Sequence, residues 1–395
     1  MWLRVVAALA VAASVSGCVG SANSGRGVHA GSSSRTSTAP VGSPGGTTGR
    51  ASTSTTPQPG PDHRAPVFAI YYLWWDRQHW TSRLGPAYPV AAGGLPLPAA
   101  LDVSGYGTVN HFAGNVETDV SPGLAYDQNN PDTVRRDVRL AASAGLTGFV
   151  VNWVGTGEPN QSPTASSLNR RLGYVFAAVR QLNAAGIPFT IILNYQSSAR
   201  HRTPAQFVND FGYFLSQYGN DPSLDHSFSP LPEVVMAGTW KYSDSDLAVI
   251  SQAMRPRMYL LGDEKPSSWD AARAQYLDGT SYYWSSQNPV KNASSFTTLD
   301  QFAATVRATP NPDGRAKTWL APFTPGYNAT LLYGTSTCVP RDNGKTMRTL
   351  FTGNASSHPD GWTLISWNEI TEGTYIVPLT RYGTKYIDAL STLLH

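Results

Sequence analysis

The sequence predicts a single (β/α)8 barrel, in which eight parallel strands are surrounded by helices, after a long polar N-terminal segment. The region 65–395 has the length of one such barrel. Apolar runs rich in Val, Ile, Tyr and Phe recur along it, each starting near a Gly or Pro. Helical patterns separate several of these runs, and alternation of strands with helices favours an α/β fold with a parallel sheet.

The predicted strands have continuous rather than alternating apolar patterns, which is typical of parallel strands covered on both faces. They fall at 67–75, 147–155, 187–196, 232–238, 257–264, 279–286, 318–327 and 362–370. Eight runs over this length favour a closed barrel over an open sheet.

The predicted helices have recognisable ends. The helix at 131–144 begins with Pro131 and Asp132 and stops before Gly145, and the helix at 172–185 stops before Gly186. Further helices are expected at 203–218, 243–254, 298–308, 345–352 and 385–394. The Gly- and Pro-rich stretch 80–130 is expected to form loops over one end of the barrel.

The N-terminal segment 1–18 has the pattern of a secretory signal. Arg4 precedes an apolar run over 5–13, and small residues follow. The ending Val-Ser-Gly-Cys at 15–18 resembles the lipobox of bacterial lipoproteins. That resemblance implies cleavage before Cys18, its acylation, and an extracytoplasmic protein anchored to the cell membrane. An ordinary secretory signal with an incidental Cys18 is the alternative.

Residues 19–64 consist mainly of Ser, Thr, Gly and Pro, with almost no large apolar side chain. Such a segment cannot bury enough apolar surface to offset the entropy lost on ordering. We therefore expect a disordered tether that links a membrane anchor to the folded region 65–395.

Composition excludes several classes of function. A net charge of +3, with 14% charged residues, argues against nucleic-acid binding, which needs a dense basic surface. The 2 Cys are too few for a disulfide framework or a Cys-based zinc site, and the 8 His show no metal-binding spacing. No cofactor, metal or protein partner is therefore indicated. The aromatic content of 11% is a weak indication of sugar binding.

Polar residues gather at the C-terminal ends of the predicted strands, the end of a barrel that carries the active site in enzymes. They are Asp76, His79, Asn152, Glu158, Asn194, Tyr195, Asp263, Glu264, Tyr282, Tyr283, Tyr327, Glu369 and Glu372. One polar residue at a strand end means little. Carboxylates, amides and aromatic rings at so many ends predict a site.

The segment 366–375, Ser-Trp-Asn-Glu-Ile-Thr-Glu-Gly-Thr-Tyr, places Glu369 and Glu372 three residues apart after the last strand. Cleavage of a glycosidic bond usually requires two carboxyl groups, one of which donates a proton to the leaving oxygen. Apolar surroundings can raise the pKa of one carboxyl group while the other stays ionised. A solvated or ion-paired pair of glutamates in a loop is the alternative.

The segment 367–378 resembles the terminal motif of glycoside hydrolase family 99, the endo-α-mannosidases and endo-α-mannanases. Further segments agree in the same order: 70–75 with His79 and Trp80, Asp278-Gly279 with Tyr283, 322–328, and 341–344. The resemblance implies a glycoside hydrolase that acts on an α-linked polysaccharide, α-mannan being the first expectation.

The resemblance also implies roles for single residues. Glu369 matches the base that deprotonates the 2-hydroxyl of the sugar, so that a 1,2-anhydro sugar forms, and Glu372 matches the general acid and later base. The overall reaction then retains configuration without a protein nucleophile. Residues expected to bind substrate are Tyr72, Trp75, His79, Trp153, Tyr195, Tyr283, Tyr327, Trp367 and Asn368. For Trp153, ordinary packing is an equal alternative to stacking on a sugar.

The sequence departs from family 99 at the end of the third strand, where Leu193, Asn194 and Tyr195 stand in place of the family's Glu-Pro-Tyr, so that the Tyr is kept and the acid is lost. It also departs at Ile370 and Thr371, where the family commonly has Trp-His. Trp367 and the Tyr-Ile pair at 375–376 better fit the α-1,3-glucanases of glycoside hydrolase family 71. An α-1,3-glucanase, and a non-catalytic glycan-binding lipoprotein, therefore remain alternatives. Asp263 and Glu264 are the alternative acids, and Asp127 and Glu158 are expected in loops.

Overall fold

The computed structural model describes residues 65–76, 78–79, 126–157, 165–196, 202–328, 338–379 and 382–395. The predicted signal, Cys18, the tether 19–64 and Glu158 lie outside the described residues. Among the residues that are described, no helix is long and apolar enough to cross a membrane.

Eight parallel strands close into a barrel in the order β1-β10-β7-β6-β5-β4-β3-β2, which confirms the predicted (β/α)8 fold. The strands are β1 Val67–Tyr72, β2 Gly148–Trp153, β3 Thr190–Tyr195, β4 Glu233–Met236, β5 Tyr259–Gly262, β6 Gly279–Ser281, β7 Thr318–Phe323 and β10 Gly361–Leu364. Each strand overlaps its predicted run; β1, β2, β4, β6, β7 and β10 begin within one residue of the start of the run, β5 begins two residues after it and β3 three residues after it. The rest of the run forms the loop at the C-terminal end of the barrel.

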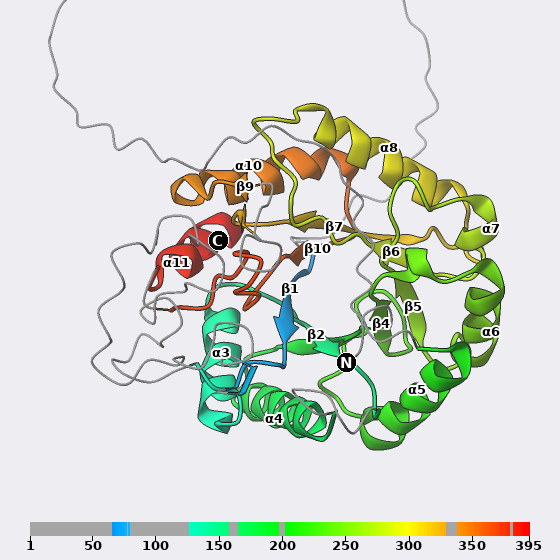
Figure 1. The fold of residues 1–395 in the computed structure, drawn as a ribbon, viewed down its shortest axis with the longest axis horizontal. Helices are drawn as coiled ribbons and strands as arrows, with labels where there is room; N and C mark the ends of the chain where they lie inside the picture. The colour runs from blue at the N-terminus through cyan, green and yellow to red at the C-terminus, as the bar shows by residue number, and fades with distance from the viewer. Residues whose placement is uncertain are drawn as a thin grey trace, which may run out of the picture. The chain divides into compact units, whose positions relative to one another are not determined.

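Helices surround the strands and follow one another around the barrel (Figure 1). They are α3 Pro131–Ser143, α4 Ala165–Ala184, α5 Pro204–Tyr218, α6 Asp244–Met254, α7 Ala271–Ala274, α8 Ser294–Ala308, α10 Lys345–Asn354 and α11 Lys385–Leu394. Short 3₁₀ helices lie at η2 Thr239–Lys241, η3 Asp342–Gly344 and η4 Ala355–Ser357, and a small hairpin pairs β8 Tyr327–Asn328 with β9 Cys338–Val339.

The starts of three helices explain where the chain leaves its loops. The side chain of Asn130 accepts a hydrogen bond from the backbone N of Asp132 at the start of α3. Thr203 with Gln206, and Ser243 with Asp246, form capping boxes at the starts of α5 and α6. These caps satisfy backbone N–H groups that have no partner within the helix.

The core has two parts. One fills the barrel interior with the side chains of Phe68, Ile70, Tyr72, Val150, Ile192, Val235, Tyr259, Leu261, Leu320 and Ile365. The other lies between the strands and the helices. Because side chains alternate along a strand, Tyr72, Asn152 and Asn194 face inward at neighbouring positions, and backbone pairing puts them in register.

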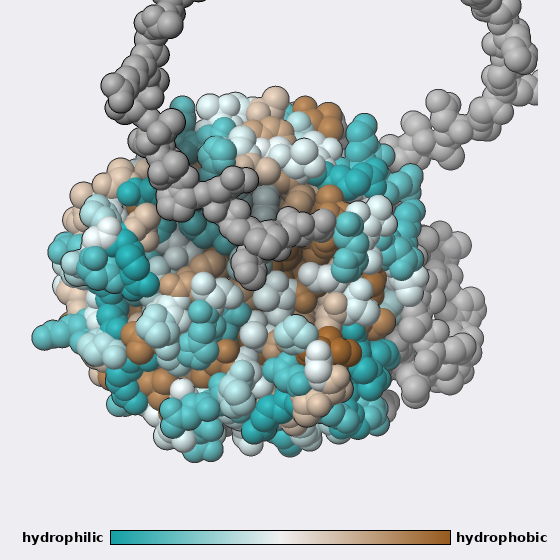
Figure 2. All heavy atoms as spheres, turned by 180° about the vertical axis from the view of Figure 1, so that it is seen from behind, coloured by the Kyte–Doolittle hydropathy of each residue, from teal (hydrophilic) through white to brown (hydrophobic). Residues whose placement is uncertain are grey.

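Polar side chains dominate the face shown in Figure 2, with apolar residues in small groups. Large apolar side chains that are exposed in the described part of the chain include Ile187, Tyr213, Val249 and Val290. Isolated apolar side chains of this kind are normal on a protein surface.

Candidate active site

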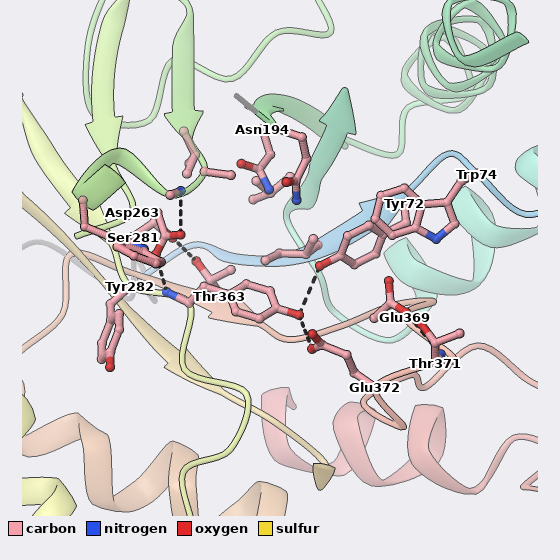
Figure 3. Close-up of a pocket in the computed structure, with 18 residues that line it drawn as sticks. Tyr72, Trp74, Asn194, Asp263, Ser281, Tyr282, Thr363, Glu369, Thr371 and Glu372 are labelled. Atoms are coloured by element: carbon pink, nitrogen blue, oxygen red, sulfur yellow. Dashed lines mark hydrogen bonds between the residues drawn. The ribbon is translucent and has the colours of Figure 1, made fainter. Parts of the chain in front are cut away.

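A cavity of about 280 Å³ opens at the C-terminal end of the barrel (Figure 3). Strand ends and loops from all around the barrel line it: Ile70, Tyr72, Trp74, Val150, Asn194, Gln196, Val235, Ala237, Gly238, Trp240, Asp263, Ser281, Tyr282, Tyr283, Thr363, Glu369, Thr371 and Glu372. Both predicted catalytic glutamates and two predicted substrate-binding residues, Tyr72 and Tyr283, are therefore in one cavity.

Glu369 is held in place by its own loop. Its backbone N donates to the side-chain oxygen of Ser366 at 2.7 Å. One carboxylate oxygen, Oε1, accepts from the backbone N of Thr371 at 3.1 Å and from the Thr371 hydroxyl. Only 4% of Glu369 is exposed. Thr371 therefore acts on the orientation of the carboxylate, although it replaces a different residue of family 99.

Glu372 ends a chain of hydrogen bonds across the cavity. The Tyr283 hydroxyl donates to Oε2 of Glu372 at 2.7 Å, and the Tyr72 hydroxyl donates to that of Tyr283 at 3.1 Å, as the dashed lines in Figure 3 show. Burial raises the pKa of Glu372, while hydrogen bonds from Tyr283 and Ser285 lower it in part. A raised pKa keeps a carboxyl group protonated at higher pH, as a general acid requires.

The loop that carries both glutamates is fixed from two other elements. The backbone N of Asn328 in β8 donates to the backbone O of Glu372 at 2.8 Å. Arg341 donates to the carbonyl oxygens of Gly373 at 2.9 Å and Tyr375 at 2.6 Å. Its guanidinium also lies 4.4 Å from the centroid of the Tyr382 ring. The segments around 322–328 and 341–344 therefore position the glutamate loop.

Asn368 fastens the same loop to β1. Its side chain accepts from the backbone N of Tyr72 at 2.7 Å and donates to the backbone O of Tyr72 at 2.9 Å. The indole N–H of Trp75 donates to the backbone O of Asn368. Both Asn368 and Trp75 are buried and neither lines the cavity. They position the glutamate loop against β1, and neither is among the residues that line this cavity.

The other aromatic residues expected to bind sugar lie outside the cavity. Trp153 and Tyr195 end their strands facing outward, and Trp153 donates to Asn169 at 2.7 Å while Tyr195 donates to Asp210 at 2.5 Å. Trp367 packs on Phe149 with ring centroids 5.4 Å apart. All three side chains expected to bind sugar are fully buried, and packing accounts for their positions in this structure.

His79 and Tyr327 also do not line the cavity. His79 is buried with its ring edge-to-face on Trp75 at 4.9 Å, and its backbone N donates to Asp76 at 2.7 Å. Tyr327 lies in the β8–β9 hairpin, where it pairs with Val339. The expected sugar contacts of both residues are not supported by these positions.

Several cavity residues were not predicted from sequence, among them two tryptophans and a glutamine. Trp74 stacks against Tyr72 with centroids 4.4 Å apart, and Gln196 follows β3. Trp240 lies in η2, and Lys265 Nζ is 3.5 Å from the centroid of its ring. An aromatic residue soon after a strand end was the available signal for Trp74 and Trp240, but it could not tell which ring turns inward.

Asp263 and Glu264, the two alternative acids, have different environments. Asp263 lines the cavity and accepts from the backbone N of Tyr283 and of Gly238, each at 2.9 Å. Burial raises the pKa of Asp263 to about 6. Glu264 is fully buried and ion-paired with Arg273 at 2.8 Å, outside the cavity. Only Asp263 is therefore placed where it can meet a ligand.

Asp127 is a loop residue, as predicted, and accepts from the backbone N of Asn129 at 2.8 Å. No cluster of three or more His, Cys, Asp or Glu side chains that could hold a metal ion occurs among the described residues.

No family model matches the sequence, and no curated protein matches it. Solved structures do match. A GH99 endo-α-mannosidase from Bacteroides thetaiotaomicron has a TM-score of 0.59 and 15% identity, with 84% of this chain and 97% of that chain covered. The chain has a GH99-like fold. The same enzyme in complex with BIS-TRIS-propane also gives 0.59, with 96% of that chain covered.

A further solved structure with this GH99-like fold is described as a glycoside hydrolase-like protein. It has a TM-score of 0.55 and 15% identity, and the match covers 86% of this chain and 97% of that chain. The fold expected from the motif resemblance is thereby confirmed over nearly the whole length of these structures.

Proposed function

We propose that the chain is a glycoside hydrolase that cleaves internal α-glycosidic bonds of a polysaccharide, with α-mannan as the first candidate substrate. One observation carries the proposal: Glu369 and Glu372 face the same cavity, at the end of the barrel where such enzymes act, in different environments. Two carboxyl groups with separate roles are the usual requirement for cleavage of a glycosidic bond.

In the first step Glu369 takes the proton of the sugar 2-hydroxyl. The oxygen attacks C1, the bond from C1 to the leaving oxygen breaks, and Glu372 gives its proton to that oxygen. The pKa of Glu372, raised by burial, suits it to this donation. The contacts from Thr371 hold the Glu369 carboxylate toward its own loop and fix its direction.

In the second step water opens the 1,2-anhydro ring at C1. Glu372, now ionised, takes a proton from the water, and Glu369 returns its proton to the 2-oxygen. Two displacements at C1 give net retention of configuration. Tyr283 stays protonated because burial raises its pKa, so it can donate to Glu372 while that group is charged.

Stereochemistry separates α-mannan from α-1,3-glucan. Attack by the 2-oxygen needs that oxygen and the leaving group on opposite faces of the ring. An α-mannoside meets this condition and an α-glucoside does not. If the substrate is α-1,3-glucan, Glu369 cannot act through the 2-hydroxyl. As a base it activates water directly and the product has inverted configuration, whereas as a nucleophile it forms a glycosyl-enzyme and configuration is retained.

The test uses the chain with and without the Glu372→Gln substitution, incubated with α-mannan, α-1,3-glucan and cell-envelope lipoglycans. New reducing ends, oligosaccharide lengths by mass spectrometry, and the anomeric configuration of fresh product by NMR are measured. Oligomers released from α-mannan with retained configuration, and absent with the variant, support the proposal. Binding of a polymer without any release favours the non-catalytic glycan-binding alternative.

The proposal also includes a lipid anchor at Cys18, on the sequence pattern alone, which holds the protein outside the cytoplasm. The chain has 2 Cys, and Cys338 is disulfide-bonded in the structure. A thiol that carries an acyl chain cannot also form a disulfide. Mass spectrometry of the unreduced protein from native membranes therefore distinguishes the two: an acylated Cys18 peptide supports the anchor, and a disulfide-linked Cys18–Cys338 pair overturns it.

A further inference from the structure

The side chain of Asp263 joins three neighbouring strand ends at the cavity. The paired residues of β5 end at Gly262, both toward β4 and toward β6, and Asp263 is the next residue. One of its carboxylate oxygens accepts from the backbone N of Gly238, after β4, and the other from the backbone N of Tyr283, after β6. Both bonds are 2.9 Å long and are drawn as dashed lines in Figure 3. The carboxylate therefore continues the connection on both sides where strand pairing stops.

Each of the two loops held in this way carries a side chain of the cavity. Gly238, with φ of 68°, turns the chain after β4 and brings Trp240 to the cavity. The Tyr283 hydroxyl donates to Oε2 of Glu372 at 2.7 Å. Asp263 is therefore bonded to the turn that precedes a cavity tryptophan, and to the backbone of the residue that holds the proposed general acid.

Both bonds depend on the charge of Asp263. An ionised carboxylate accepts hydrogen bonds on both oxygens, whereas a protonated carboxyl group has an O–H donor on one of them. Protonation therefore sets a donor against one of the two backbone N–H groups. Burial raises the pKa of Asp263 to about 6, although the bonds from Tyr283 and Gly238 lower it in part. Both bonds are made above about pH 6, and one of them is lost as the pH falls below it.

The elements around Asp263 carry further charged and titratable side chains. They are Glu264 and Lys265 in its own loop, Lys241 in η2, Tyr72 in β1, Tyr282 and Tyr283 after β6, and Glu369 and Glu372 in the glutamate loop. Burial raises the pKa of the three tyrosines, which stay neutral near pH 6. Glu264 is ion-paired with Arg273 at 2.8 Å. The two cavity glutamates are carboxyl groups as well, so the experiment has to separate their titration from that of Asp263.

We propose that Asp263 is a positioning residue. Its ionised carboxylate holds the loops of Trp240 and Tyr283 and, through the Tyr283 hydroxyl, keeps the general acid in place. Loss of this charge lowers activity on the acidic side of the pH range. The inference rests on the proposed function and adds a residue that makes it depend on pH. Direct contact of the Asp263 carboxylate with a sugar hydroxyl is the competing explanation.

The two explanations differ in the ligand-free protein, because only a positioning residue changes the surroundings of Trp240 as it titrates. The first measurement therefore follows tryptophan fluorescence between pH 4.5 and 8 without ligand. It uses the Glu372→Gln variant, in which this glutamate cannot titrate. The contribution of Trp240 is the difference between that protein and the same protein with Trp240→Phe. We expect a transition with its midpoint near pH 6, which Asp263→Asn abolishes.

Asp278→Asn is the matched control. Asp278 is also buried and accepts from the backbone N of Leu260 in β5 at 2.8 Å, but it lies at the N-terminal end of the barrel, outside the cavity. The change in chemistry is the same, so a general loss of stability affects both variants. We expect Asp278→Asn to lower the Tm and to leave the midpoint of the Trp240 transition in place.

The second measurement gives kcat and KM on α-mannan against pH, with Glu372 intact. Wild-type kcat at pH 5 should be about ten-fold below its value at pH 7.5, because about one Asp263 in ten is then ionised. In Asp263→Asn an NH₂ donor stands where the carboxylate has an acceptor, as in the protonated acid. This variant should have about ten-fold lower kcat at pH 7.5, no limb near pH 6, and a KM within about three-fold of wild type. Asp278→Asn keeps the limb.

A Trp240 signal without a transition near pH 6, or a transition that persists in Asp263→Asn, overturns the inference and leaves the proposed function standing. A higher KM with unchanged kcat in Asp263→Asn also overturns it and favours direct contact with the sugar. An Asp263-dependent transition in a protein that releases no oligosaccharide from any polymer supports the positioning role and overturns the proposed hydrolysis. If Asp263→Asn does not fold, the titration with Asp263 intact decides, and a midpoint below pH 5 overturns the inference.

Discussion

Buried carboxyl groups with raised pKa values occur at both ends of the barrel. At the N-terminal end Glu233, the first residue of β4, has 0% exposure, and burial followed by the charge of Asp225 raises its pKa to about 9. At the C-terminal end burial raises the pKa of Glu372 and brings that of Asp263 to about 6. A shifted pKa is therefore common to both ends.

The surroundings differ. Glu233 accepts the backbone N–H of Phe228 at 2.6 Å, and the Phe228 ring packs edge-to-face on Phe68 at 6.4 Å beneath the barrel interior. Glu372 and Asp263 instead face a cavity. Burial alone shifts a pKa. A site also needs access for a ligand, which the cavity gives to Glu372 and Asp263.

The largest expected effect is the difference in kcat between two variants, each of which replaces one carboxyl group with an amide: Glu372→Gln at the C-terminal end of the barrel and Glu233→Gln at the N-terminal end. Glu372→Gln removes the proton donor, so kcat on α-mannan falls by about 10²–10⁴-fold. Glu233→Gln, the matched change at the N-terminal end of the barrel, leaves kcat within about two-fold of wild type. Reducing-end assays on both variants, with folding checked by circular dichroism, measure the difference. Equal losses in the two variants would contradict the assignment of the acid.

The next effect concerns how Glu233, at the N-terminal end of the barrel, makes the free energy of unfolding depend on pH. Because the pKa of Glu233 is raised in the folded state, the folded protein holds a proton that the unfolded chain releases between about pH 4.5 and 9. This group therefore lowers the free energy of unfolding as pH rises through that range. Relative to wild type, the free energy of unfolding of Glu233→Gln should gain on the order of 4 kcal/mol between pH 5 and pH 8. Urea unfolding at the two pH values measures it, and a constant difference would show that Glu233 titrates normally.

A smaller effect is expected from Tyr283→Phe, which removes the hydrogen bond that lowers the pKa of Glu372. The pKa of Glu372 then rises further, so the alkaline limb of the kcat profile moves to higher pH. The value of kcat at the optimum falls about ten-fold, because the acid is no longer held in position. Tyr282→Phe, a cavity-lining neighbour, is the control and should leave the limb in place. A limb that moves to lower pH in Tyr283→Phe would refute the assigned role.

Sequence reasoning located the scaffold and the two glutamates well, because both leave local signals. Every barrel strand lies within or at the edge of a predicted apolar run and begins within three residues of its start, and Glu369 and Glu372 follow the last strand. It located only part of the aromatic lining, because Tyr72, Tyr282 and Tyr283 line the cavity as well as Trp74 and Trp240, which were not predicted. Strand alternation turns Val150 inward and Trp153 outward, but this parity depends on the register of the strands, which a single run does not reveal.

Beyond the strand ends, side chains no longer alternate regularly between inward and outward positions. β1 ends at Tyr72, and the two tryptophans that follow it point to different places. Trp74 lines the cavity, whereas Trp75 donates a hydrogen bond to the backbone O of Asn368 in the glutamate loop. Gly238, with φ of 68°, turns the chain after β4 and brings Trp240 to the cavity. Turns of this kind depend on contacts between distant segments, so local patterns could not predict these positions.

The smallest expected effect separates a cavity tryptophan from a core tryptophan. Trp240→Ala removes a ring that is half-buried at the cavity and leaves the strands intact, so KM rises about three- to ten-fold with little change in Tm. Trp153→Phe loses packing and the bond to Asn169, so the free energy of unfolding falls by about 1–3 kcal/mol while KM stays the same. Steady-state kinetics and thermal unfolding of both variants test the pair. A rise in KM for Trp153→Phe, with no rise for Trp240→Ala, would favour the sugar-stacking alternative for Trp153.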